Sequence, residues 1–322
     1  MRQKSHHLQY LEALHFRNGL TLEEEKEYQK LLQGCQGEVD FDKLCQFFSI
    51  SKEQMLDDIT LSLFKNVTQI DKIIISGNVL YLIDVKNYQG NYRYERQRWT
   101  LNGNILSNNI FEQLRRAVRI VQQILNQSGI QLSVKGVLVF MNPNSKIDII
   151  DSVDEIVLDV SQIPQWLMSL QPQFIKTTSW QSALKKYQIP NYRTSLITSP
   201  KLFSKLIRGV RCINCGSFVT KKQYRFSLEC PCGQREAKEI AILRTVCEYS
   251  VIRHDKLLKK KDVCQFVGKE YNSHYIREIL KKYFRLAKDS KFYENKGVCI
   301  DYLFKDNPEY ISSFKERIYW KQ

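Results

Sequence analysis

Four cysteines have the spacing of a metal site. Residues 211–234 read RCINCGSFVTKKQYRFSLECPCGQ, which places one Cys-x2-Cys pair 14 residues before a Cys-x-Cys pair. Four thiolates coordinate Zn²⁺ tetrahedrally, and two such pairs separated by a β-hairpin are typical of a zinc ribbon. Buried free thiols or a redox pair are the alternatives. We predict a structural Zn²⁺, because four ligands leave no open coordination position; its ligands are Cys212, Cys215, Cys230 and Cys232.

A second group joins carboxylates and a lysine in the first half of the chain. Asp84 and Lys86 end a run of apolar residues that reads as a strand. Because strand side chains alternate, these two point to the same face. Asp71 lies on the preceding apolar run, and counting back from a tight turn at Gly77-Asn78 pairs it near residue 84. The two carboxylates are therefore expected to meet.

This group suits metal-assisted chemistry on a phosphate. Carboxylate oxygens bind Mg²⁺, which takes only one or two protein carboxylates and keeps several waters. A bound metal acidifies a water and neutralises charge on a phosphoryl oxygen, and a lysine can orient the water or stabilise the transition state. The structural alternative is a cross-strand ion pair between Asp71 and Lys86 with no catalytic task.

The segment that carries these residues resembles a known family. Residues 69–90 read QIDKIIISGNVLYLIDVKNYQG, a Gln-Ile-Asp strand, a turn, and a strand that ends in an acidic residue, any residue, Lys and Asn, with Gly soon after. This pattern resembles the core of the NERD family, the nuclease-related domain. The matching residues are Gln69, Ile70, Asp71, Asp84, Lys86, Asn87 and Gly90.

Two further features extend the resemblance over roughly residues 30–145. Gly37-Glu38 is similar to the Gly-Glu pair that opens the domain, and Gln113 within NNIFEQLRRAV is similar to a family glutamine. Asp84 stands where the family usually has Glu, and Asn109-Ile110 lacks the usual Pro. The resemblance implies a PD-(D/E)xK nuclease fold. It also implies Asp71 and Asp84 as ligands of Mg²⁺ or Mn²⁺, Lys86 as the charge-stabilising or water-orienting residue, Glu38 as a further acid, and Gln113 as a supporting side chain.

Periodicity predicts the elements that position these residues. Apolar residues recur at helical spacing through 110–127, and β-branched runs alternate with turn residues elsewhere, as at Asn102-Gly103. Together they indicate an α/β domain with a mixed central sheet flanked by helices, restriction-endonuclease-like, as the family resemblance implies. We expect helices over 22–32, 38–48, 110–127 and 162–170, strands over 59–64, 69–76, 79–86, 134–140 and 155–159, and a hairpin over 91–106.

The positive charge lies in the C-terminal part. Residues 181–322 contain 30 Lys and Arg against 14 Asp and Glu, whereas residues 1–180 contain 19 against 20. Such asymmetry favours a polyanionic partner, with nucleic acid first and an anionic membrane second. A solvated basic surface is the alternative.

The region after the cysteines is expected to be a small α+β domain of winged-helix type. Residues 236–250, 258–267 and 272–285 read as helices, with Asn272-Ser273 capping the last, and 291–304 could supply two strands of a wing. A helical packing domain with a basic face is the alternative. The candidate nucleic-acid contacts are Lys259, Lys260, Lys261, His274, Arg277, Lys281 and Lys282.

Chain length and composition complete the expectations. The 322 residues are long for one core. No apolar run reaches the length of a membrane span, and the N-terminus lacks a secretion signal, so we expect a cytoplasmic protein that contacts no membrane. The basic C-terminal part leads us to expect DNA as the partner. The expected divisions are an N-terminal helical extension (1–29), a nuclease-like domain (30–180), a linker (181–205), the ribbon (206–235) and the basic domain (236–322). A metal-dependent nuclease, a non-catalytic DNA-binding protein on a nuclease-like scaffold, and a protein-interaction adaptor are the competing functions, and the oligomeric state is left open.

Overall fold

The chain forms two compact units. The computed structural model describes residues 4–107, 109–170, 178–189, 200–218, 221–253, 256–288 and 291–295. Unit 1 is Lys30–Tyr192 and unit 2 combines Lys4–Gln29 with Arg193–Gln322, each taken over its described residues. The N-terminal segment, expected as a separate extension, thus groups with the C-terminal part of the chain.

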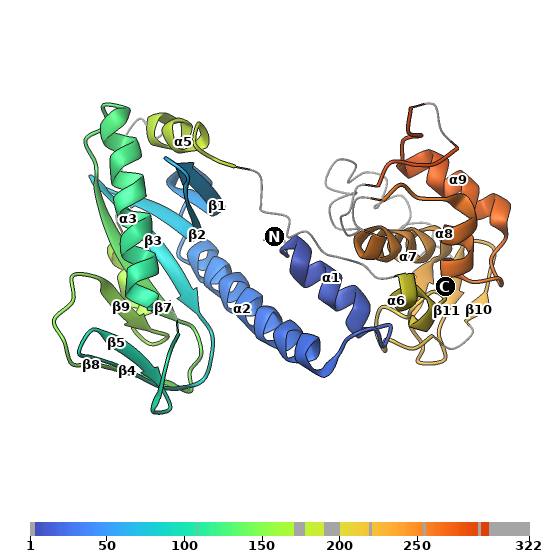
Figure 1. Cartoon of the computed structure of the whole chain (residues 1–322), viewed down its shortest axis with the longest axis horizontal. Helices are drawn as coiled ribbons and strands as arrows, with labels where there is room; N and C mark the ends of the chain where they lie inside the picture. The colour runs from blue at the N-terminus through green and yellow to red at the C-terminus, as the bar shows by residue number, and fades with distance from the viewer. Residues whose placement is uncertain are drawn as a thin grey trace. The chain divides into compact units, whose positions relative to one another are not determined.

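Unit 1 is built on two mixed sheets (Figure 1). The main sheet has the order β1-β2-β3-β7-β9, with β1, β2 and β3 antiparallel and β3, β7 and β9 parallel. The small sheet has the order β6-β5-β4-β8. The strands of the two sheets are β1 (Met55–Leu63), β2 (Asn66–Ser76), β3 (Val79–Lys86), β4 (Gly90–Glu95), β5 (Arg98–Leu101), β6 (Asn104–Ile105), β7 (Ser133–Phe140), β8 (Ser145–Ile149) and β9 (Ile156–Asp159).

Helices cover both faces of the main sheet, as Figure 1 shows for α2 and α3. The apolar stripe of α3 (Ile110–Gln127) packs in one buried cluster with α5 (Thr178–Lys185) and the small sheet. The other face packs against α2 (Leu22–Phe47) and α4 (Ile163–Ser169), with Phe41 and Cys45 of α2 in its core. A short 3-10 turn, η1 (Lys52–Gln54), precedes β1. The expectation of a mixed α/β fold with helices flanking the sheet is confirmed.

Several predicted boundaries are wrong. The helices expected over 22–32 and 38–48 are the single helix α2, since Gly34 and Gly37 lie within it and do not end it. The hairpin expected over 91–106 contains two tight turns, because Arg96 and Gln97 adopt positive φ in addition to Asn102 and Gly103. The short strand β8 and the helix α5 were not predicted. By contrast, α3 and β3 begin and end at the predicted residues.

Unit 2 contains short strands and six helical segments or parts of them within the described residues. A three-stranded sheet of order β10-β11-β12 lies among the predicted cysteine ligands. The described elements of unit 2 are α1 (His6–His15), the start of α2, α6 (Pro200–Lys205), β10 (Lys222–Gln223), β11 (Ser227–Glu229), β12 (Arg235–Ala237), α7 (Lys238–Arg253), α8 (Lys260–Val267) and α9 (Ser273–Tyr283). Most of the expected wing, residues 296–304, lies outside the described residues. In the described part of the chain, no helix is both long and apolar enough to cross a membrane.

A buried arginine connects α1 to the rest of unit 2. Arg17 has no exposed surface, donates to the carbonyl oxygens of Ile207 and Gly209, and forms an ion pair with Glu248 on α7. Glu248 also pairs with Arg211 and Arg244. Burial raises the pKa of Glu248, but the three guanidinium groups outweigh burial and hold the pKa below its ordinary value. The network therefore keeps the N-terminal segment in unit 2.

Candidate functional site

The two predicted carboxylates lie where β2 and β3 separate. Their antiparallel pairing runs from Ser76↔Val79 to Lys72↔Ile83, so Asp71 and Asp84 come next in register. Beyond that point the Asp71 Oδ2 atom accepts a hydrogen bond from the backbone amide of Val85 at 2.9 Å. A side chain thus takes the place of a strand-to-strand bond, and it holds the Asp71 carboxylate beside the end of β3.

The alternation of β2 changes at Asp71. Ile70 and Ile73 both pack in the α3-side core, although residues three apart in a regular strand point to opposite faces. The β1–β2 pairing passes from Asp57↔Lys72 to Ile59↔Ile70, and the residue opposite Asp71 is Asp58, with φ of +46°. Irregularities of this kind re-aim a side chain, and they occur often beside functional sites. Here Asp71 keeps the face of Ile73 and Ile75, and the irregularity brings the side chain of Ile70 to the same α3 face.

Asp84 and Lys86 share that face, as their spacing predicts. The Lys86 ammonium lies 2.6 Å from Oδ1 of Asp84, and both side chains are mostly buried. The other carboxylate oxygen, Asp84 Oδ2, is buried and has no hydrogen-bond partner among the described residues. An unpaired buried carboxylate oxygen is costly and is usually explained by a ligand, ion or water.

Glu38 reaches this cluster because α2 approaches β3 closely at Gly37. A Cβ added to Gly37 would lie 2.4 Å from Cβ of Asn87, which leaves no room for any side chain there. Asn87 is fixed by two reciprocal hydrogen bonds with Gln33 on α2, each 2.8 Å long. Asn87 Nδ2 donates to the Gln33 carbonyl, and Gln33 Nε2 donates to the Asn87 carbonyl. Gly37-Glu38, predicted to open a helix, therefore lies at the contact between α2 and the end of β3.

The cluster carries more negative than positive charge. Burial, then the Asp84 carboxylate, then the Glu38 carboxylate raise the pKa of Asp71 well above its usual range, although the Val85 amide and Lys86 oppose them. Burial lowers the pKa of Lys86, but Asp84 and Asp71 outweigh burial and raise it. Lys86 is thus a firmly charged ammonium among three acids. Crowded carboxylates with one neighbouring cation are the donor set that a divalent metal ion satisfies.

Gln113 of α3 lines a small cavity with the two aspartates. The cavity has a volume of about 20 Å³. A water molecule needs roughly 10–15 Å³ by this measure, so the space suits one water or ion. Its lining residues are Gln69, Ile70, Asp71, Ile83, Asp84, Gln113, Leu114 and Ala117. Four of the five predicted residues therefore meet at one place through the cavity and the Asp84–Lys86 pair, and Glu38 acts on Asp71 and Tyr88 electrostatically.

The four predicted cysteines also meet. Their sulfur atoms all lie within 4.8 Å of one another, with Cys212 Sγ 3.7 Å from Cys232 Sγ and Cys215 Sγ 3.6 Å from Cys230 Sγ. Four thiolates about 2.3 Å from one Zn²⁺ in a tetrahedron lie roughly 3.8 Å apart, so the spacing fits zinc. Both turns end in a glycine at positive φ, Gly216 and Gly233, whose amides bond back to Cys212 and Cys230.

The thiols of this cluster depend on one another for ionisation. A hydrogen bond from the Gln234 amide, aided by the other three thiols, lowers the pKa of Cys232 to about 6. At Cys230 a backbone bond from Cys232 lowers the pKa, but burial and the neighbouring thiols outweigh it and raise it to about 12. One thiolate forms readily and further ionisation is resisted, so deprotonation of all four thiols needs a neighbouring positive charge such as a bound metal ion.

The predicted nucleic-acid residues of unit 2 divide into two groups. Lys281 and Lys282 form ion pairs with Glu278 and Glu239, each at 3.0 Å. Lys259, Lys261, His274 and Arg277 are exposed, and Lys260 is partly exposed. Lys260 and Lys261 line a groove of about 720 Å³ between α8 and the start of α9, where the Asn272 side chain caps α9.

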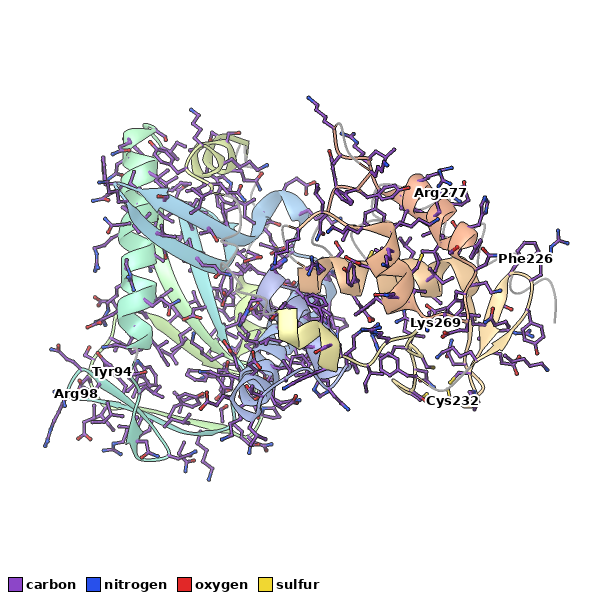
Figure 2. The ribbon with its side chains drawn as sticks, turned by 45° about the vertical axis from the view of Figure 1, so that its right-hand side comes forward. Tyr94, Arg98, Phe226, Cys232, Lys269 and Arg277 are labelled. Atoms are coloured by element: carbon purple, nitrogen blue, oxygen red, sulfur yellow. The ribbon has the colours of Figure 1, made fainter. Side chains whose placement is uncertain are left out.

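Lys269 also lines this groove, although sequence reasoning missed it. Figure 2 labels Lys269 and Arg277 in this part of unit 2. Lys269 follows Gly268, outside the consecutive lysines 259–261 and the expected recognition helix from which the candidate contacts were chosen. The charge asymmetry of the C-terminal part was the one clue that included it.

Comparison with known proteins agrees with the cluster of unit 1. Residues 33–141 match the family model of NERD, the nuclease-related domain, and the resemblance inferred from residues 69–90 is confirmed. The match contains Glu38, Asp71, Asp84, Lys86 and Gln113 and ends before the cysteine cluster. No curated protein and no solved structure matches the chain.

Proposed function

We propose that this protein is a metal-dependent nuclease that hydrolyses phosphodiester bonds in DNA. The observation that carries the proposal is the meeting of Asp71, Asp84 and Lys86 at the point where β2 and β3 separate, inside a segment that matches the nuclease-related domain. We assign Asp71 and Asp84 as the ligands of Mg²⁺ or Mn²⁺.

The residues present fit such an ion. Asp84 Oδ2 is buried and lacks a protein partner among the described residues, and the pKa of Asp71 is raised by burial and by its acidic neighbours. Hard cations prefer carboxylate oxygens, and Mg²⁺ is commonly held by one or two of them. A divalent ion here would satisfy the orphaned oxygen and balance the excess negative charge.

Each side chain then has a distinct task. The metal, when bound, supplies a water of lowered pKa and a positive charge beside the phosphoryl oxygens. Lys86 keeps its proton and donates to Asp84 Oδ1, and its ammonium has further N–H groups that could donate to the attacking water or to a phosphoryl oxygen. Gln113 orients water in the cavity, and Glu38 adds negative charge that favours the cation. The water oxygen would bond to phosphorus as the bond from phosphorus to the leaving oxygen breaks; the water loses a proton to solvent, and the leaving oxygen takes one up from solvent.

Unit 2 would contribute to DNA binding. Its zinc ribbon is assigned a structural role because all four donors are thiols. The ribbon hairpin exposes Phe226 beside Arg225, a pairing of aromatic and basic side chains that suits nucleic-acid contact. Phe226 and Cys232 are labelled on this module in Figure 2. The groove that contains Lys260, Lys261 and Lys269 offers phosphate contacts in a winged-helix-like domain.

A cleavage assay on supercoiled plasmid and single-stranded DNA in Mg²⁺ or Mn²⁺ tests the proposal. D84N and K86A should each lose about 100-fold or more of the activity, the usual effect of removing one preorganised electrostatic group. K135A is the matched control, because Lys135 is an exposed lysine that pairs with Tyr81 at the far end of β3. Salt-sensitive DNA binding without cleavage by the wild-type protein would instead support a non-catalytic binding protein.

A further inference from the structure

Arginine is concentrated in one segment of unit 1. Residues 87–126 contain six Arg, no Lys and two Glu. The rest of Lys30–Tyr192 contains eleven Lys and Arg against thirteen Asp and Glu. The segment is therefore locally positive within a unit that is otherwise slightly acidic, a contrast that the charge of whole halves of the chain conceals.

Four of these arginines are exposed to solvent. Arg96 and Arg98 lie at the turn between β4 and β5, and Arg116 and Arg119 lie on α3. Within the described residues, none of the four forms an ion pair. The remaining two do: Arg93 pairs with Glu95 and Asp148, and Arg115 pairs with Glu155.

Hydrogen bonds fix this surface relative to the carboxylates. Asn109 caps α3 by accepting from the Phe111 amide, and its Nδ2 atom donates to the Gln97 carbonyl in the β4–β5 turn at 3.1 Å. Gln113, one helical turn further along α3, lines the cavity of Asp71 and Asp84. The β4–β5 turn is thus tied to the helix that reaches the proposed metal site.

Arginines lie on both sides of Gln113 along the surface formed by the β4–β5 turn and α3. The turn with Arg96 and Arg98 precedes it, and Arg116 follows it by three residues on the same helix face. Beside the turn is a concave surface of about 500 Å³ lined by Arg93, Glu95, Arg96, Arg98, Thr100 and Ile105. Figure 2 shows Arg98 at the outer margin of the small sheet.

We propose that this arginine surface binds the sugar-phosphate backbone of DNA on both sides of the bond that is cleaved. The proposal rests on the proposed nuclease function and adds a DNA-binding surface in unit 1, distinct from the basic groove of unit 2. A DNA strand with one phosphate at the carboxylate cavity must extend from the cavity in two directions. Arg96 and Arg98 of the β4–β5 turn lie in one direction, and Arg116 of α3 lies in the other. Arginine suits this task because its planar guanidinium binds phosphate oxygens in a bidentate manner.

The test is the salt dependence of DNA binding by the full chain. Affinity for a fluorescent DNA duplex is measured between about 50 and 200 mM salt, in Ca²⁺ so that binding is observed without relying on cleavage. Each phosphate contact contributes about 0.9 to the slope of log affinity against log salt. R96A/R98A should lower the slope by about 1.8, so the wild type should lose roughly 12-fold more affinity than the variant over this range. R96K/R98K, which keeps the charge, should restore most of the slope.

K185A/K186A is the matched control. Lys185 ends α5 and Lys186 follows it, and both are exposed. The helix α5 packs at the other end of α3, where Tyr187 donates to Gln127. The 18 residues of α3 place that end about 27 Å from the β4–β5 turn. The control should keep the wild-type slope.

The outcomes separate this surface from the nuclease function. A lowered slope in R96A/R98A supports the surface even where the wild type cleaves no DNA, an outcome that would overturn the nuclease function alone. An unchanged slope in a folded R96A/R98A, or an equal loss in K185A/K186A, overturns the proposed surface whatever the cleavage assay shows.

Discussion

Replacing Gly37 by alanine tests how α2 positions the candidate site. The new Cβ would lie 2.4 Å from Asn87 Cβ and 2.9 Å from its Cγ, and ordinary contact begins near 3.4 Å. Asn87 cannot easily retreat, because two 2.8 Å hydrogen bonds hold it to Gln33. The helix must therefore move away from β3 by about 1 Å, and Glu38 moves with it.

Both activity and stability should respond. A displacement of about 1 Å at a catalytic centre can lower the rate about 100-fold, so G37A should cleave DNA about 100-fold more slowly. Overpacking costs about 1–3 kcal/mol, against a gain of about 1 kcal/mol from replacing glycine in a helix. The net change in the free energy of unfolding of unit 1 should lie between zero and a loss of about 2 kcal/mol.

G34A is the matched control one turn earlier on the same helix. The Cβ added at residue 34 would have Tyr88 Oη as its nearest neighbour, at 3.6 Å, which is an ordinary contact. The free energy of unfolding of G34A should therefore rise by about 1 kcal/mol, and the variant should keep its activity. The two variants should differ in Tm by roughly 3–9 °C for unit 1. Scanning calorimetry and the plasmid cleavage assay measure both effects. A G37A protein as stable and as active as G34A would show that α2 does not need a glycine at this contact.

Three further predictions concern unit 2. R17M removes a fully buried cation from Glu248 and should destabilise unit 2 by about 3 kcal/mol, measured by chemical denaturation; a loss confined to unit 1 would contradict it. E248Q should destabilise unit 2 at neutral pH, because the pKa of Glu248 is lower in the folded state than in the unfolded state. The stabilisation from the Glu248 carboxylate is present above the unfolded-state pKa of about 4.3 and is lost as pH falls through the folded-state pKa. The difference in Tm between wild type and E248Q should therefore shrink below pH ~4, and a constant difference would refute this origin. Zinc chelation, or C230S, should lower the Tm of unit 2 and leave that of unit 1 unchanged, whereas equal shifts in both would contradict a structural zinc site confined to the ribbon.

Local signals predicted the parts of the fold that depend on near neighbours. The helix α3 was predicted with its bounds because its apolar residues recur at helical spacing along its whole length, and in the structure Asn109 caps it. The turn at Gly77-Asn78 fixed the register that brings Asp71 level with Asp84. The cysteine spacing anticipated four sulfur atoms that meet.

Features set by distant contacts could not be read from the sequence. Two helices were expected over 22–32 and 38–48, but they form one helix in which Gly37 allows the approach of α2 to Asn87, 50 residues away in the chain. The change of alternation at Asp71 lies opposite Asp58 of β1, whose φ is positive, and no local pattern marks it. Arg17 likewise had no signal, since its partner Glu248 is 231 residues distant.

Asp71 and Asp84 are proposed to hold a divalent metal ion, and electron paramagnetic resonance of bound Mn²⁺ can detect such a site. Wild-type protein should bind Mn²⁺ at a site that D71N and D84N each lose. K86A should retain the site and bind at least as tightly, because the ammonium that occupies Asp84 Oδ1 is gone. Binding that survives in D84N, or a wild-type protein that binds no Mn²⁺, would contradict the assignment.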